Sequence, residues 1–348
     1  MRLFYLSELE PGMVLAKPVY SEDGRCLVNF DFVLTEKIIE RIKTLDYDRV
    51  WIKDDFDDVS DYLSDELKLK AVRSIKSIFT GYATNKKANF DIKKIDVLKD
   101  VVENVVEEII SNRQCVIQLS NLRNFSNSMY EHAVDVARVS VLIGVNMGLN
   151  KAQLCALCEA AMMHDIGKTQ LSPSLLSKTT EYTKEEMEEM TKHPALGYRM
   201  MKDTDKFKAP AYIAVLQHHE RFDGTGFPEG IKGEKINQFS RIIKIADVYS
   251  NMRSGTINTQ PYSQSEVIEY FYADGSRQFD PNILKIFLSK VPIYEVGQII
   301  KLSNGQKAFV AQNNEGALAR PIVRVMVDDK TVGEEIDLSK NFNITIVA

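Results

Sequence analysis

All five histidines of this 348-residue chain lie between positions 132 and 219, and aspartates accompany them. His164 and Asp165 are adjacent in Met-Met-His-Asp-Ile-Gly-Lys, and His218 and His219 form a second adjacent pair. Neutral imidazole and carboxylate groups bind first-row transition metals, and a carboxylate can bridge two ions where a neutral imidazole binds only one. Asp165 is therefore the natural bridging ligand.

The histidines are more informative as a set than singly, because any one of them alone would more often be an ordinary core or surface residue. Burying several titratable rings without metal or partners costs free energy, and this cost favours a shared role. In chain order the candidate metal ligands are His132, His164, Asp165, His193, His218, His219 and Asp247. Their pattern predicts a site for divalent cations.

The sequences around these residues resemble the HD-GYP family, a branch of the HD-domain metal phosphohydrolases. The resemblance covers roughly residues 110–290 and rests on His-Asp-Ile-Gly-Lys, His-Pro-Ala-Leu-Gly, Ile-Lys-Gly-Glu-Lys-Ile and His-His-Glu-Arg-Phe-Asp-Gly-Thr-Gly-Phe-Pro. Active members hydrolyse the bacterial second messenger cyclic di-GMP, and some act on related cyclic dinucleotides. The resemblance implies a bacterial phosphodiesterase that produces the linear dinucleotide pGpG and, as a further product, GMP.

The same resemblance implies a dinuclear centre of divalent transition metals, with Fe or Mn as the expected ions. One ion would be bound by His132, His164, Asp165 and Asp247, and the other by Asp165, His193, His218 and His219. Ions bridged at about 3.5–4 Å can share a hydroxide that attacks phosphorus in line. Some members use a glutamate one turn before His132 for a third ion, but Ser128 stands there, so two ions are expected.

Two further features would complete the site. Lys168 follows Asp165 by one turn of a predicted helix and could contact a non-bridging phosphate oxygen, although a surface lysine is the alternative. Glu220 and the loop after it are interpreted as structural support for the ligands, with no catalytic role. The loop residues are Asp223, Gly224, Gly226, Phe227 and Pro228, and Phe227 replaces the tyrosine that gives the family its name.

The segment after Asp247 departs from the family pattern, in which basic side chains grip the dinucleotide. Ser250 replaces a second aspartate, and Gln260 and Ser263 stand where basic residues are expected. Arg253 is the candidate substitute for substrate binding. This altered segment keeps two alternatives open: a cyclic-dinucleotide receptor with little or no turnover, and an HD phosphohydrolase for another nucleotide.

The elements that must position these residues are mainly α-helical. Residues 113–290 carry apolar positions at three- and four-residue spacing, which predicts an HD-domain helical bundle, and residues 61–112 predict two connecting helices. Residues 1–60 predict a small α/β module with strands over 12–20, 25–34 and 48–53, an Asp23-Gly24 turn and a helix after Thr35. Residues 291–348 predict a small β-rich extension with strands over 297–303, 306–312, 322–327 and 344–347.

Composition excludes several classes of protein. The net charge is −5, so no nucleic-acid polymer is expected as a partner, and an anionic substrate would need local positive charge. The chain has no apolar run long enough to span a bilayer and no secretory leader, so a cytoplasmic location without membrane attachment is expected. The four cysteines, Cys26, Cys115, Cys155 and Cys158, are expected to be reduced and mostly buried. The N-terminal module is expected to mediate homodimer formation or docking to a signalling protein.

Overall fold

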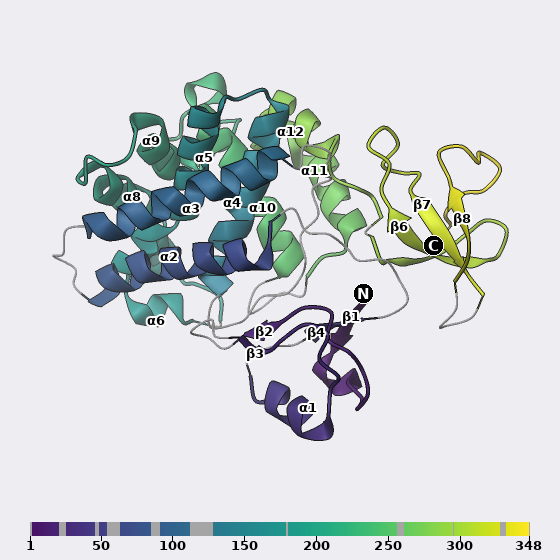
Figure 1. The fold of residues 1–348 in the computed structure, drawn as a ribbon. Helices are drawn as coiled ribbons and strands as arrows, with labels where there is room; N and C mark the ends of the chain where they lie inside the picture. The colour runs from purple at the N-terminus through teal and green to yellow at the C-terminus, as the bar shows by residue number, and fades with distance from the viewer. Residues whose placement is uncertain are drawn as a thin grey trace. The chain divides into compact units, whose positions relative to one another are not determined.

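The computed structural model describes residues 2–20, 26–45, 49–53, 63–84, 91–111, 128–178, 180–255, 261–294, 296–327 and 332–347. The chain divides into two units by its contacts, a helical unit of Tyr62–Arg113 with Met129–Leu288 and a second unit that contains the N-terminal and C-terminal parts. Figure 1 shows the helices of the first unit. The first unit is helical and holds all the candidate ligands. Among the described residues, no helix is long and apolar enough to cross a membrane.

The helical unit is built around α5 (Lys151–Met163), which packs against α3 (Ile92–Ser111), α9 (Ala209–Gln217) and α10 (Gln238–Ser254). Helix α5 is buried on most sides because its sequence is apolar all round. The remaining helices are α2 (Asp65–Thr84), α4 (Ser128–Asn146), η3 (Ile166–Gln170), α6 (Pro173–Leu176), α7 (Lys184–Met190), α8 (His193–Lys202), η4 (Gly233–Lys235), α11 (Gln264–Gln278) and α12 (Pro281–Leu288). The mainly α fold is therefore confirmed.

Helices α2 and α3 belong to the same compact unit as the bundle. They pack on each other, α3 contacts α5, and α2 contacts η3, which begins immediately after Asp165. The apolar face of α3 buries seven side chains, among them Ile95, Val102 and Ile109. The two helices thus support the segment that carries the candidate bridging ligand.

The N-terminal module contains β1 (Arg2–Tyr5), η1 (Leu6–Glu8), β2 (Val19–Tyr20), β3 (Cys26–Val28), α1 (Glu36–Lys43) and β4 (Arg49–Ile52). The predicted helix after Thr35 and the last predicted strand are confirmed. The long strands predicted over 12–20 and 25–34 are wrong, since only β2 and β3 and isolated bridges form there. One reason is Asp31, whose φ of 63° is incompatible with an extended strand. The Asp23-Gly24 turn lies outside the described residues.

A further strand of this module, β1, was not predicted from the sequence, and it pairs antiparallel with β4. The module has its own core, which includes Leu15, Ile42 and Val50. The cysteine prediction is also corrected here, because Cys26 is exposed. Cys155 and Cys158 on α5 are free thiols, half-buried and buried, and Cys115 lies outside the described residues.

The C-terminal part forms a four-stranded antiparallel sheet in the order β5 (Ile299–Lys301), β6 (Lys307–Gln312), β7 (Ile322–Met326), β8 (Val332–Asp337). Strand β8 was not predicted, because its sequence Val-Gly-Glu-Glu-Ile-Asp is polar, and pairing with β7 holds it. The strand predicted over 344–347 is reduced to one bridge between Leu302 and Ile346. The sheet has a separate core that includes Leu302, Val310 and Val323.

Candidate metal centre

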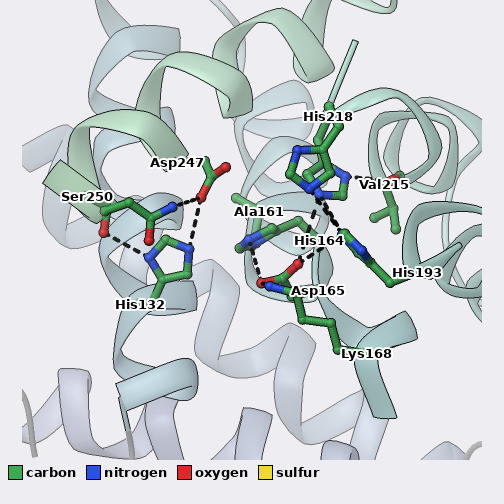
Figure 2. A network of polar contacts seen from close by, with 12 residues as sticks. His132, Ala161, His164, Asp165, Lys168, His193, Val215, His218, Asp247 and Ser250 are labelled. Carbon is green, nitrogen blue, oxygen red and sulfur yellow. Dashed lines mark hydrogen bonds and ion pairs between the residues drawn. The ribbon is translucent and has the colours of Figure 1, made fainter. Parts of the chain in front are cut away.

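Two groups of histidine and aspartate side chains converge in the helical unit and share Asp165 (Figure 2). In each group, one ligand atom from every member lies within 4.8 Å of the others; the groups are His132, His164 and Asp165, and Asp165, His193, His218 and His219. Asp247 adjoins the first group, with its Oδ1 atom 3.0 Å from His132 Nε2. The structure therefore brings all seven predicted ligands together.

Helix ends bring most of these ligands to one point. His164 follows the last turn of α5, and Asp165 precedes η3. His193 begins α8, with Pro194 next to it as is favoured at a helix start, and His218 follows the last turn of α9. His132 and Asp247 come from the bodies of α4 and α10.

A close approach of η3 to α8 brings Asp165 and His193 together. A Cβ atom at Gly167 would lie 1.9 Å from the carbonyl oxygen of His193 and 2.6 Å from the backbone nitrogen of Gly197. Only glycine leaves room for this backbone contact. As a result, Asp165 Oδ1 lies 3.3 Å from His193 Nε2 although the two residues belong to different elements.

Backbone carbonyls set the orientation of three histidine rings. The Nδ1 atoms of His164, His193 and His218 each lie 2.7 Å from the carbonyl oxygen of the residue three positions earlier. A carbonyl oxygen only accepts hydrogen bonds, so each Nδ1 carries the proton and donates it. In the neutral ring, Nε2 is then left as an acceptor that can bind a metal.

The acceptor atoms of His193 and His218 point at each other, and the Nε2 atom of His219 lies beside that of His193. His193 Nε2 lies 3.3 Å from His218 Nε2 and 3.1 Å from His219 Nε2. Asp165 Oδ1 is buried and accepts no hydrogen bond from any residue that the structure describes. Buried acceptors without donors are costly, and a shared cation would satisfy all of them. The donor set thus fits divalent metal ions on both sides of Asp165.

Burial keeps most of these rings neutral. It lowers the pKa of His193 to about 4 and that of His219 to about 3, and it holds the pKa of His218 well below its ordinary value. For Asp165, burial alone would raise the pKa, but Lys168 and His164 outweigh burial and hold the pKa well below its usual range. Neutral imidazoles around an ionised carboxylate are the protonation states that metal binding requires.

The depressed histidine pKa values predict how acid affects the metal-free protein. Between about pH 6.5 and about pH 4, the unfolded chain takes up protons at His193, His218 and His219 that the folded chain does not, so stability should fall. We expect a loss of about 2 kcal/mol per depressed histidine at pH 5. Asp165 outweighs burial and raises the pKa of His164, so this ring opposes the loss of stability in acid. Because three rings have a lowered pKa and only this one a raised pKa, the net effect of acid is still a loss of stability.

Urea unfolding of metal-free protein at pH 7.5 and pH 5 measures this effect. His219→Gln should reduce the pH dependence, because it removes one of the three rings. Stability that is equal at the two pH values, or higher at pH 5, would contradict the assignment of these rings as buried and neutral.

Lys168 reaches the centre from its rim. Its Nζ atom lies 2.6 Å from Asp165 Oδ2, and its side chain is 27% exposed. Burial lowers the pKa of Lys168, but the carboxylate of Asp165 outweighs burial and raises it. The ammonium group is thus charged and close to the candidate bridging ligand.

Glu220 anchors the loop that follows the second histidine pair. Its side chain is buried, and Oε1 accepts hydrogen bonds from the backbone nitrogens of Glu229 at 2.7 Å and Gly230 at 3.1 Å. Gly226 lies so close to the start of the loop that a Cβ atom there would be 2.3 Å from the nitrogen of Arg221. These contacts fold the loop back on itself.

The folded loop places Phe227 against a candidate ligand. The rings of Phe227 and His219 stack with centroids 4.7 Å apart and planes 19° apart. Asp223 and Gly224 form the preceding turn, where Asp223 Oδ1 accepts from Thr225 and Gly224 has a φ of 86°. The loop ends at Pro228. The ring of Phe227 supports His219 through its face, so the missing hydroxyl group of the family's tyrosine is not needed for this contact.

Two residues near the first group were not identified as functional from the sequence. Ser250 Oγ lies 3.1 Å from His132 Nδ1, and Asn251 Nδ2 donates to Asp247 Oδ1 at 2.7 Å. Both follow Asp247 by three or four residues on α10, so helical spacing was the signal that could have found them. Each orients a candidate metal ligand.

Arg253 occupies a different environment from the one predicted for a substrate contact. It is 2% exposed on α10 and donates from a guanidinium nitrogen to the carbonyl oxygen of Tyr262. It thus fastens the segment before α11 to the end of α10, and it is not a member of either ligand group. That Arg253 contacts substrate stays a prediction.

A helical unit with paired histidine and aspartate ligands at its helix ends defines the class of HD-domain proteins. The family described as "HD domain" matches residues 104–283. The chain belongs to this family, and the motifs around its candidate ligands place it in the HD-GYP branch.

Named relatives support this assignment. The chain is 28% identical over 226 residues to cyclic di-GMP phosphodiesterase PA4108 of Pseudomonas aeruginosa, covering 65% of this chain and 54% of that protein. It is 32% identical over 154 residues to the cyclic di-GMP phosphodiesterase response regulator RpfG of Xanthomonas campestris, covering 44% of this chain and 41% of RpfG. The chain thus spans about half the length of the curated relatives it matches.

A solved structure shares the fold. Bd1817, an HDG"Y"P protein from Bdellovibrio bacteriovorus, aligns with a TM-score of 0.55 at 18% identity, over 82% of this chain and 98% of Bd1817. The fold of this chain is therefore similar to that of Bd1817.

Proposed function

We propose that this protein is a metal-dependent phosphodiesterase that hydrolyses cyclic di-GMP to pGpG and, on further cleavage, to GMP. The observation that carries the proposal is Asp165, which lies between two groups of imidazole acceptors and is shared by both. The names of the two curated relatives support the choice of substrate.

In the proposed site, Asp165 would hold both of two ions, Fe or Mn. One ion would be held by His132, His164, Asp165 and Asp247, and the other by Asp165, His193, His218 and His219. Such ions, when bound, supply a water-derived nucleophile at neutral pH and neutralise charge on the phosphoryl oxygens. The three carbonyl-anchored rings and the stacked ring of His219 hold the ligands in place before substrate arrives.

Among the residues of this chain, Lys168 supplies positive charge at the scissile phosphate. Its Nζ atom already lies at Asp165, and its partial exposure lets the ammonium group turn to a phosphate oxygen. As a point charge with three donors, it can follow the phosphoryl group as charge develops there.

The receptor alternative also rests on a specific observation. Ser263, which stands where the family has a basic residue, instead caps α11 by accepting from the backbone nitrogen of Glu266. This loss of charge would weaken the positioning of the dinucleotide for cleavage, which favours a receptor with little or no turnover.

The test is turnover by the metal-loaded full chain against cyclic di-GMP, cyclic di-AMP, cyclic GMP-AMP and mononucleotides, with products separated by chromatography. Release of pGpG from cyclic di-GMP is expected. Tight binding of cyclic di-GMP without product would favour the receptor, and turnover of a mononucleotide alone would favour the other phosphohydrolase.

We expect Lys168→Met to lower kcat/KM for cyclic di-GMP by about tenfold to a hundredfold, the size of a lost charge-assisted hydrogen bond. Metal content should stay at the wild-type value, because Lys168 is not a ligand. The matched control is Lys184→Met, on the exposed start of α7. Unchanged kinetics at saturating metal would remove Lys168 from the reaction.

A further inference from the structure

Lys244 is a cation near the candidate metal centre that the proposed reaction has not used. It is half-buried on α10, and no hydrogen bond or ion pair of its ammonium group is found among the residues that the structure describes. The group interacts electrostatically with two of the candidate metal ligands, Asp247 and His219, and with the guanidinium group of Arg221. Burial lowers the pKa of Lys244, although the carboxylate of Asp247 opposes the shift.

The position of Lys244 on α10 places it beside the metal centre. A helix turns by about 100° per residue, so Lys244, Asp247, Val248 and Asn251 share one face. Asn251 donates to Asp247. One face of α10 therefore carries a candidate metal ligand and, one turn before it, a half-buried lysine.

A cyclic dinucleotide carries a second anionic group for this lysine to bind. Its ring contains two phosphodiester groups, and only one of them can occupy the metal centre during cleavage. The other keeps a negative charge that needs a cation close by. Gln260 and Ser263 do not provide one, whereas Lys244 lies about 4.5 Å along the helix axis from Asp247, within reach of a bound ring.

On the basis of the proposed function, we propose that Lys244 binds the phosphate of the cyclic dinucleotide that is not being cleaved. The contact is a charge-assisted hydrogen bond from the ammonium group to a non-bridging phosphate oxygen. Lys168 then contacts the scissile phosphate and Lys244 the other phosphate. Their positions fit these roles, because Lys168 lies at Asp165 and Lys244 lies one turn from Asp247 on a different element.

The experiment compares two substrates of the metal-loaded full chain. Cyclic di-GMP has two phosphates, whereas bis(4-nitrophenyl) phosphate has a single phosphodiester and nothing for Lys244 to hold. Lys244→Met should raise both KM and the Kd measured by calorimetry for cyclic di-GMP by about tenfold to a hundredfold. Hydrolysis of the nitrophenyl ester should change by less than about twofold, and metal content should not change.

Two further variants complete the design. Lys244→Arg keeps the charge and should retain most of the affinity for cyclic di-GMP. Lys285→Met removes an exposed lysine from α12 in the same unit and should leave both substrates unaffected.

The outcomes separate the inference from the proposed function. Equal losses on both substrates, or lost metal, would show that Lys244 supports the metal centre and would overturn its role at the second phosphate. Unchanged affinity of Lys244→Met for cyclic di-GMP would also overturn the role of Lys244. Turnover of cyclic di-GMP by the wild-type protein would still support the proposed function in that case. A wild-type protein that cleaves only the nitrophenyl ester would refute the substrate and the inference together.

Discussion

Asp165→Asn should abolish both metal binding and turnover while leaving the fold intact. Asp165 is the one residue shared by the two ligand groups, so its loss weakens both cation sites at once. An asparagine has nearly the same volume but no charge, and its amide can donate to the facing Nε2 atom of His193, 3.3 Å from Oδ1. We expect kcat/KM for cyclic di-GMP to fall by roughly a thousandfold or more.

The measurements for this variant are elemental analysis of the loaded protein and thermal unfolding of the metal-free protein. Bound metal should drop from two ions per chain, whereas the metal-free unfolding temperature should equal or exceed that of the wild type. Asp203→Asn, an exposed aspartate at the end of α8, is the matched control. Two fully bound ions with normal turnover in Asp165→Asn would mean that the centre is assembled around another residue.

Gly167→Ala should destabilise the helical unit by about 3 kcal/mol or more, at the upper end of the cost of overpacking. The added methyl group would meet the backbone of His193 at 1.9 Å, and backbone cannot move aside as a flexible side chain can. The helices η3 and α8 must therefore separate. Because Asp165 and His193 are carried by these two elements, their ligand atoms would separate too, and metal affinity would fall together with stability.

Urea unfolding with and without metal measures both effects, and Gly316→Ala is the control. A Cβ atom at Gly316 meets nothing within 4 Å, and its backbone φ is not positive, so that variant should be nearly neutral. If Gly167→Ala unfolds too readily to be loaded, metal titration at 10 °C with added osmolyte still reports affinity. Wild-type stability and metal content in Gly167→Ala would show that the contact between η3 and α8 is not needed.

The chemistry of the centre could be predicted from residue type and order. Imidazole and carboxylate are recognisable as ligands wherever they occur, and motifs such as His164-Asp165 and His218-His219 are local in sequence. The helices that carry them were predictable for the same reason, since apolar spacing is a local property. Two strands were missed for different reasons: β1 is short and is held by β4, which lies far along the chain, whereas β8 has a polar sequence and is held by its neighbour β7.

The sequence by itself determined which residues can bind metal and that helices carry them, because side-chain chemistry and helical periodicity are written in neighbouring positions. Only the tertiary structure decided how those residues meet. It placed Asp165 between the two groups and brought Ser250 next to His132, which it orients. It also buried Arg253. These outcomes depend on packing between helices far apart in the chain, such as the contact of Gly167 with His193, which no local pattern records.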